Sequence, residues 1–142
     1  MTTIANKDGV IAYDSRVTRG SLIGHDDYDK LIHRNGHQFL LTGSGCDFAA
    51  LIDEFLGVKL CDKPLEAYGL VVTNGRLSQI GQDAEAEFGM DEIWAERPFA
   101  LGSGRDFALA AMDMGATAER GCRNGSQSRY LNRLHDTLAC FG

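Results

Sequence analysis

One nine-residue pattern occurs twice in the chain, as Leu41-Thr42-Gly43-Ser44-Gly45-Cys46-Asp47-Phe48-Ala49 and as Ala100-Leu101-Gly102-Ser103-Gly104-Arg105-Asp106-Phe107-Ala108. In each copy an apolar strand is followed by Gly-Ser-Gly and then by a helical pattern. Two interpretations of the turn stand. It is a tight strand-to-helix connection that needs the backbone freedom of glycine, or it is a cradle of backbone N–H groups suited to negative charge. No Gly-Lys-Ser or Gly-Lys-Thr follows, which excludes a P-loop.

Two helices are expected directly after these turns, over Asp47 to Phe55 and over Asp106 to Met114. Each begins at an aspartate, which suits an N-cap or a first turn. Apolar residues recur in both at the spacing of one helix face. In the first helix that face is Phe48, Leu51, Ile52, Phe55 and Leu56, and in the second it is Phe107, Ala110, Ala111 and Met114.

Three β-hairpins are expected around Asp8-Gly9, Asn35-Gly36 and Asn74-Gly75, because these dipeptides supply the positive φ that tight hairpin turns need. The flanking strands are Ile4-Ala5 with Val10 to Tyr13, Leu31-Ile32 with Phe39 to Leu41, and Leu70 to Val72 with Leu77 to Ile80. Three hairpins predict antiparallel sheet and exclude a Rossmann-type parallel core. The acidic stretch from Ser78 to Pro98 is weakly patterned and predicts a solvated connection without chemistry.

Composition predicts a single domain, because 142 residues leave no room for two full cores. The net charge of −6 disfavours nucleic acid as a partner. No apolar run approaches the roughly 20 residues of a membrane span, and the start lacks the layout of a signal peptide, so a cytoplasmic protein is expected. The four cysteines do not have the spacing of a zinc site, so neither a metal site nor a disulfide framework is expected. They are Cys46, Cys61, Cys122 and Cys140.

The beginning of the chain carries the chemistry. Aminopeptidase removes an initiator Met readily before a small residue, so the mature chain is expected to begin at Thr2. An N-terminal threonine holds a nucleophilic hydroxyl and a basic α-amine on one residue. A cation close by helps to keep that amine neutral, because like charges repel.

Several segments match one family in order and spacing. They are Thr2-Thr3-Ile4-Ala5, the stretch from Asp8 to Gly20, Lys30 sixteen residues after Asp14, Phe39-Leu40-Leu41 before Gly43-Ser44-Gly45, and Ala100-Leu101-Gly102-Ser103-Gly104. Together they resemble the proteasome β-type and HslV-like threonine peptidases of the N-terminal nucleophile (Ntn) hydrolase superfamily. The resemblance covers roughly residues 2–56 and 68–119. It implies an α+β fold, a four-layer α-β-β-α sandwich of antiparallel sheets.

The resemblance also implies the site. Thr2 is the nucleophile, its amine is the general base, Lys30 lies near the amine, and Asp14 is the counter-ion of Lys30. The N–H of Gly43 stabilises the oxyanion, with Gly45 as the alternative. Ser103 hydrogen-bonds the amine or a bridging water. Two alternatives stand beside these roles: Asp14 and Lys30 as a plain surface ion pair, and Ser103 as a turn residue only.

By this resemblance the chain is an endopeptidase that needs no cofactor. Its implied partners are a polypeptide substrate, further copies of itself in a ring or related oligomer, and an ATPase unfoldase. Neither nucleic acid nor membrane is expected. Two alternative functions remain: a catalytically inactive scaffold or assembly subunit of the same fold, and a small-molecule amidase of the same superfamily.

Two features depart from the family. Only one helix fits between the first Gly-Ser-Gly turn and Lys63-Pro64, where family members usually carry two. The later Asp-x-x-Ser/Thr-Gly motif is missing, and residues 120–142 form an atypical tail with Arg120, Arg123, Arg129 and Arg133. The tail is interpreted as a basic surface helix, as a partner-binding segment, or as the product of a shifted reading frame from Arg129 onward.

Overall fold

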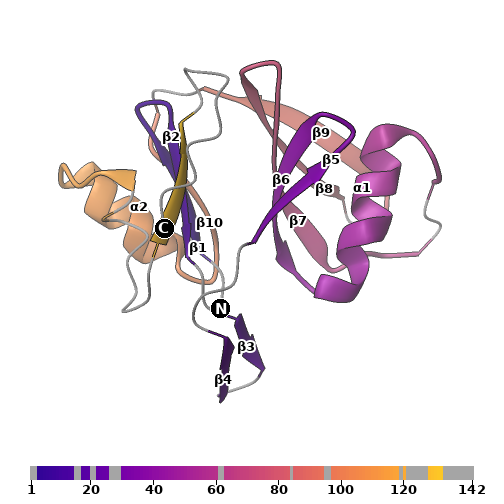
Figure 1. Ribbon diagram of the computed structural model, residues 1–142, viewed down its shortest axis with the longest axis horizontal. Coiled ribbons are helices and arrows are strands. Elements are labelled where there is room, and N and C mark those ends of the chain that lie inside the picture. Colours follow the sequence, from indigo (N-terminus) through magenta and orange to yellow (C-terminus); the bar gives the residue numbers. More distant parts are fainter. Residues whose placement is uncertain are drawn as a thin grey trace. The chain divides into compact units, whose positions relative to one another are not determined.

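A computed structural model describes residues 3–14, 17–19, 22–25, 30–60, 63–83, 85–94, 97–118, 120 and 128–132. The chain divides into two compact units (Figure 1). The first combines Met1–Lys30 with Trp94–Gly142, and the second is Leu31–Ile93. In each unit the described residues include an antiparallel sheet and an α-helix. Within the described ranges, no helix is both long and apolar enough to cross a membrane.

The first unit has a four-stranded sheet in the order β10-β1-β2-β11, with every neighbouring pair antiparallel. Helix α2 packs on strands β1 and β10. A separate two-stranded ribbon, β3-β4, follows β2 in the chain. The bounds are β1 Thr3–Lys7, β2 Val10–Asp14, β3 Val17–Arg19, β4 Leu22–His25, β10 Phe99–Gly102, α2 Arg105–Asp113 and β11 Ser128–Asn132.

The second unit has a five-stranded antiparallel meander in the order β5-β6-β7-β8-β9. One α-helix, α1, is described between β6 and β7, preceded by the single 3₁₀ turn η1. The described residues therefore agree with the expectation of one helix before Lys63-Pro64. The bounds are β5 Leu31–Arg34, β6 His37–Gly43, η1 Gly45–Asp47, α1 Phe48–Leu56, β7 Ala67–Thr73, β8 Arg76–Gln82 and β9 Phe88–Ile93.

The three predicted hairpins are confirmed as β1-β2, β5-β6 and β7-β8. Both central residues of each turn have positive φ: 52° and 78° at Asp8-Gly9, 51° and 78° at Asn35-Gly36, and 50° and 73° at Asn74-Gly75. This is the backbone signature of a type I′ turn, whose twist matches that of the paired strands. The prediction of antiparallel sheet is therefore correct, and its cause is local turn chemistry.

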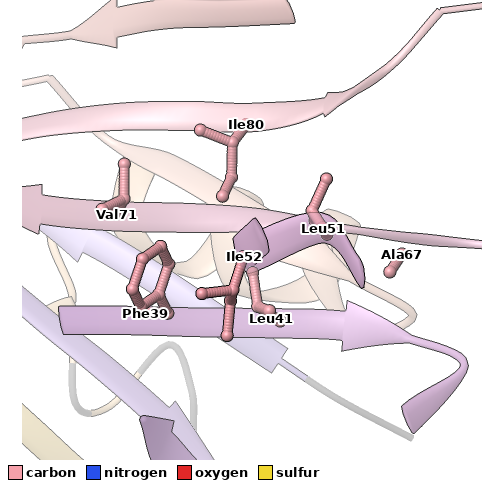
Figure 2. Packing of buried hydrophobic residues seen from close by; sticks show 7 residues of the cluster. All are labelled: Phe39, Leu41, Leu51, Ile52, Ala67, Val71 and Ile80. Carbon is pink, nitrogen blue, oxygen red and sulfur yellow. The ribbon is translucent and has the colours of Figure 1, made fainter. Parts of the chain in front are cut away.

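The core of the second unit lies between α1 and its sheet (Figure 2). Strand residues that alternate along β6 and β7 meet Leu51 and Ile52, which are 0% and 1% exposed. Alternation along a strand sends every second side chain to the same face, and the helix covers that face. The buried cluster is Phe39, Leu41, Leu51, Ile52, Ala67, Val71 and Ile80.

The core of the first unit is built from small residues. Ala100, Ala5 and Ala12 form one row across β10, β1 and β2, and α2 contributes Ala108 and Met112 to the same cluster. Alanine on both sides lets the helix approach the sheet closely. Lys7 closes the far end of α2, because its Nζ donates to Met112 O at 3.1 Å and to Ala116 O at 2.9 Å.

The face of α2 that packs on the sheet differs from the predicted apolar face. Ala108 and Met112 are buried, whereas Phe107 is 80% and Met114 is 90% exposed. The prediction chose the face with the largest apolar residues. In the structure the buried face instead carries Ala108 and Met112, which pack with Ala5 and Ala12 of the sheet.

Three further expectations need correction. The stretch from Ser78 to Pro98 is not only a connection, because its residues complete β8 and form β9, which pairs with β8. In the tail, residues 128–132 form strand β11 and not a helix, since they extend the sheet beside β2. The Asp47 carboxylate does not cap α1 and instead accepts the Glu66 N–H at 2.9 Å.

Candidate active site

Asp14 and Lys30 form an ion pair that is largely shielded from solvent, in the first unit. Asp14 is the last residue of β2, and its Oδ1 lies 2.8 Å from Lys30 Nζ. Their side chains are only 3% and 10% exposed. The alternative of a plain surface pair is therefore wrong, because neither charge faces solvent freely.

The same carboxylate oxygen of Asp14 holds the start of β1. The Thr3 N–H donates to Asp14 Oδ1 at 2.9 Å, and this contact is buried. That N–H belongs to the peptide bond between residues 2 and 3, so Asp14 and Lys30 are connected to the backbone beside the predicted nucleophile. Thr2 itself lies outside the described residues.

The second Gly-Ser-Gly turn lies against the start of β1. Thr3 is paired with Gly102 at the end of β10, where φ is +90°. Ser103 is the exposed residue of this turn, and Gly104 is buried behind it. A Cβ built on Gly104 would overlap Thr3 Oγ1. The structure therefore brings the turn that carries Ser103 to the residue next to Thr2.

Gly43, the predicted oxyanion donor, ends β6 in the second unit and has a φ of +108°. A side chain at this position would collide with the Glu66 carbonyl, so both the conformation and the space require glycine. Beside it, the Ser44 N–H already donates to Glu66 O at 2.6 Å. Gly45, the alternative donor, is exposed, with open space around its Cα.

The Gly43 turn is held by the segment that leads into β7. Glu66 accepts the Ser44 N–H and donates its own N–H to Asp47 Oδ2. One residue earlier, the Leu65 N–H donates to Gln82 Oε1 at 2.7 Å, and Gln82 Nε2 donates to the buried Glu54 at 2.8 Å. Strand β8 and helix α1 therefore position this segment, and the segment positions the turn.

Among the residues that the structure describes, one group of acidic side chains could reach a common metal ion: Asp83, Glu85 and Glu87. All three are exposed, and Asp83 Oδ1 already accepts the N–H groups of Glu85 and Glu87 at 2.9 Å. These bonds are those of a tight loop between β8 and β9. The loop conformation therefore accounts for the closeness of the three carboxylates.

Sequence reasoning missed Thr3 and Gly104. Both lie inside the quoted motifs, each directly after a predicted catalytic residue. The available signal was the second threonine after Met1 together with the second glycine of Gly102-Ser103-Gly104. Only the tertiary structure shows that the two residues meet, because pairing of β1 with β10 brings the Gly104 turn against the Thr3 side chain.

No protein-family model matches the sequence, and no curated protein matches it either. Solved structures do match. The protein BPH of Thiobacillus denitrificans, solved in complex with epoxomicin, has a TM-score of 0.59 and 17% identity, over 92% of this chain and 97% of that one. Eukaryotic HslV from Trypanosoma brucei has a TM-score of 0.61 and 19% identity, over the same shares of the two chains.

These likenesses establish the fold. The chain has the α+β fold of the HslV- and proteasome-type proteins, and its described residues include a four-stranded and a five-stranded antiparallel sheet, each with a helix packed on it. The fold class and the structural resemblance predicted from sequence are therefore confirmed. Identities of 17% and 19% carry the comparison no further than the fold.

Proposed function

We propose that this chain is an N-terminal threonine peptidase that hydrolyses peptide bonds with Thr2 as its nucleophile, after removal of Met1. One observation carries the proposal. Asp14 Oδ1 accepts both Lys30 Nζ and the Thr3 N–H, at 2.8 and 2.9 Å. The charge pair, which is largely shielded from water, is thereby connected to the backbone directly beside Thr2. The chain also has the HslV-like fold that the resemblance of its sequence implies.

Energetics supports a functional reason for this pair. Taking two charges out of water costs about as much as their attraction returns, and apolar residues of similar volume often stabilise a fold as well or better. Side chains that are 3% and 10% exposed fall in that regime. Stability alone therefore gives little reason to place a lysine and an aspartate here.

The proposed reaction has two steps. The Thr2 hydroxyl attacks the substrate carbonyl, its α-amine takes the proton, and the N–H of Gly43 stabilises the oxyanion. The proton then passes to the leaving amine, and the acyl group remains on Thr2 as an ester. Water, activated by the same amine, hydrolyses the ester and releases the acid. Lys30 keeps the amine neutral by charge repulsion, Asp14 holds Lys30, and Ser103 hydrogen-bonds the amine or a bridging water.

The first experiment is the mass of the intact purified protein together with a peptide assay. We expect a mature chain without Met1, turnover of peptides by the wild type, and no turnover by Thr2→Ala. A chain that keeps Met1 has no free amine on Thr2, and equal turnover by both proteins makes Thr2 irrelevant. Either result would overturn the proposal.

Epoxomicin, the compound in the BPH complex, is an independent probe of the same site. We expect it to raise the melting temperature of the wild type and to leave Thr2→Ala unchanged, since a ligand that binds only the folded state stabilises it. Binding without peptide turnover would favour a small-molecule amidase of the same fold. If epoxomicin does not bind and no peptide is turned over, the result would favour an inactive scaffold or assembly subunit.

The remaining expectations form part of the proposal. Residues 1–142 act as one peptidase domain with an atypical tail over 120–142, in the cytoplasm, as a homo-oligomer of ring or related form. The substrate is a polypeptide, and an ATPase unfoldase is the proposed partner. Size-exclusion chromatography with light scattering tests the assembly, and a monomeric mass would contradict it.

A further inference from the structure

We propose that Thr3 is a positioning residue for the reaction and that its contact with Gly104 sets the place of Thr2 relative to Ser103. This inference rests on the proposed function, because it concerns the same nucleophile. It is carried by a different set of contacts, within the first unit, between the start of β1 and the turn before α2.

Thr3 is held from three sides. Its N–H donates to Asp14 Oδ1 at 2.9 Å, and its backbone pairs with Gly102. Its side chain lies against Gly104: a Cβ built there would overlap Thr3 Oγ1 and approach Thr3 Cβ and Cγ2 to 3.2 and 3.3 Å. Only 2% of Thr3 is exposed, so its side chain has no solvent side to turn to.

Space is the reason for a glycine at position 104. Its φ is −93° and its ψ is 8°, a conformation that any residue adopts. The corresponding glycine of the first near copy, Gly45, has nothing within 4 Å of the same built atom. Glycine is therefore required at position 104 because the Thr3 side chain occupies the adjacent space, and not because every turn of this kind requires it.

Thr3 touches both chain neighbours of Ser103, since it pairs with Gly102 and packs on Gly104. It is also bonded covalently to Thr2. Under the proposed function, we therefore expect a shift of Thr3 to be transmitted through that bond to Thr2. Misplacement of a catalytic group by about 1 Å can lower a rate by about 100-fold, so this contact is expected to affect kcat strongly.

The test is a double-mutant cycle with Gly104→Ala and Thr3→Ala. We expect Gly104→Ala to lower kcat for a peptide substrate by about 10- to 100-fold with KM within about twofold of wild type. Thr3→Ala alone removes Oγ1 and Cγ2 and is expected to lower kcat less. In the double variant the overlap with Oγ1 is removed and only the Cβ at position 3, 3.2 Å from the built atom, stays close, so kcat should return to within about threefold of Thr3→Ala.

The matched control is Gly89→Ala, on exposed strand β9, where a built Cβ meets nothing within 4 Å. It should leave kcat and the melting temperature unchanged. Wild-type kcat in Gly104→Ala, or a double variant no faster than Gly104→Ala, would overturn the inference. If Gly104→Ala does not fold, the double variant still decides, because it must fold and turn over substrate near the rate of Thr3→Ala.

A second readout does not depend on catalysis. In ¹⁵N-labelled protein, Gly104→Ala should shift the amide signal of Ser103, and the double variant should bring it back toward that of Thr3→Ala. If the Ser103 amide shifts in the variants as expected but the wild type turns over no peptide, the proposed function is refuted and the contact between Thr3 and Gly104 stands. If the wild type is active but the Ser103 signal does not respond in this way, the positioning role alone is refuted.

Discussion

Asp14 accepts two hydrogen bonds on one oxygen, from Lys30 Nζ at 2.8 Å and from the Thr3 N–H at 2.9 Å. A single carboxylate thus joins the end of β2, the residue that precedes β5 and the beginning of β1. Both side chains of the ion pair are nearly excluded from water, so a change in either partner must leave a buried charge behind. This relationship yields the sharpest prediction.

Asp14→Asn and Lys30→Met should each lower the free energy of unfolding by about 3 kcal/mol, because each removes one charge of an ion pair that is largely shielded from water. The double variant removes both charges and should recover part of that stability. Under the proposed function, peptide turnover should be lost in all three variants. Urea unfolding and the peptide assay measure the two effects separately, and turnover by the double variant would contradict the role of the pair.

Lys7→Met should lower the free energy of unfolding by about 1–2 kcal/mol. The ammonium group donates to the carbonyl of Met112 in the last turn of α2 and to that of Ala116 just beyond the helix end, where a positive charge is favourable. Thermal unfolding measures the loss. Lys59→Met is the matched control, since Lys59 is exposed, and equal losses in the two variants would show that these hydrogen bonds contribute nothing.

Phe107→Ser should change the free energy of unfolding by less than about 0.5 kcal/mol, as expected for an exposed site. Met112→Ala should lower it by about 2–3 kcal/mol, because a buried side chain is lost and a cavity remains. Their exposed fractions are 80% and 1%. Chemical denaturation compares them, and the reverse order would mean that α2 packs through the face predicted from its sequence.

Gly43→Ala should lower the free energy of unfolding by at least about 2 kcal/mol, because it forces alanine into a φ of +108° and against the backbone of Glu66. Gly45→Ala, two residues later, adds the same methyl group in open space. Its cost should stay within about 0.5 kcal/mol. Calorimetry of the two variants is the measurement, and similar melting temperatures would show that the turn does not require glycine at position 43.

Much of the fold could be predicted because its signals are local. Asp8-Gly9, Asn35-Gly36 and Asn74-Gly75 each supply two adjacent residues that tolerate positive φ, and nothing distant is needed to close those hairpins. Strands β9 and β11 were missed for the opposite reason. Each forms by adding to a strand that already exists, so its own sequence carries little of the signal.

The candidate site divides in the same way. Spacing and resemblance were enough to nominate Asp14, Lys30, Gly43 and Ser103. Neither could show that Asp14 also binds the Thr3 N–H, since that bond depends on where the end of β2 lies relative to the start of β1. Nor could they identify the contact between Thr3 and Gly104, which spans most of the chain.

By itself, then, the sequence determined the turns, the two helices and the antiparallel class, because these follow from the backbone preferences of neighbouring residues. The tertiary structure decided which face of α2 is buried, that the Asp14–Lys30 pair is shielded from water, and that Gly104 makes room for Thr3. Those outcomes depend on how closely segments distant in sequence pack, and packing is a property of both surfaces together.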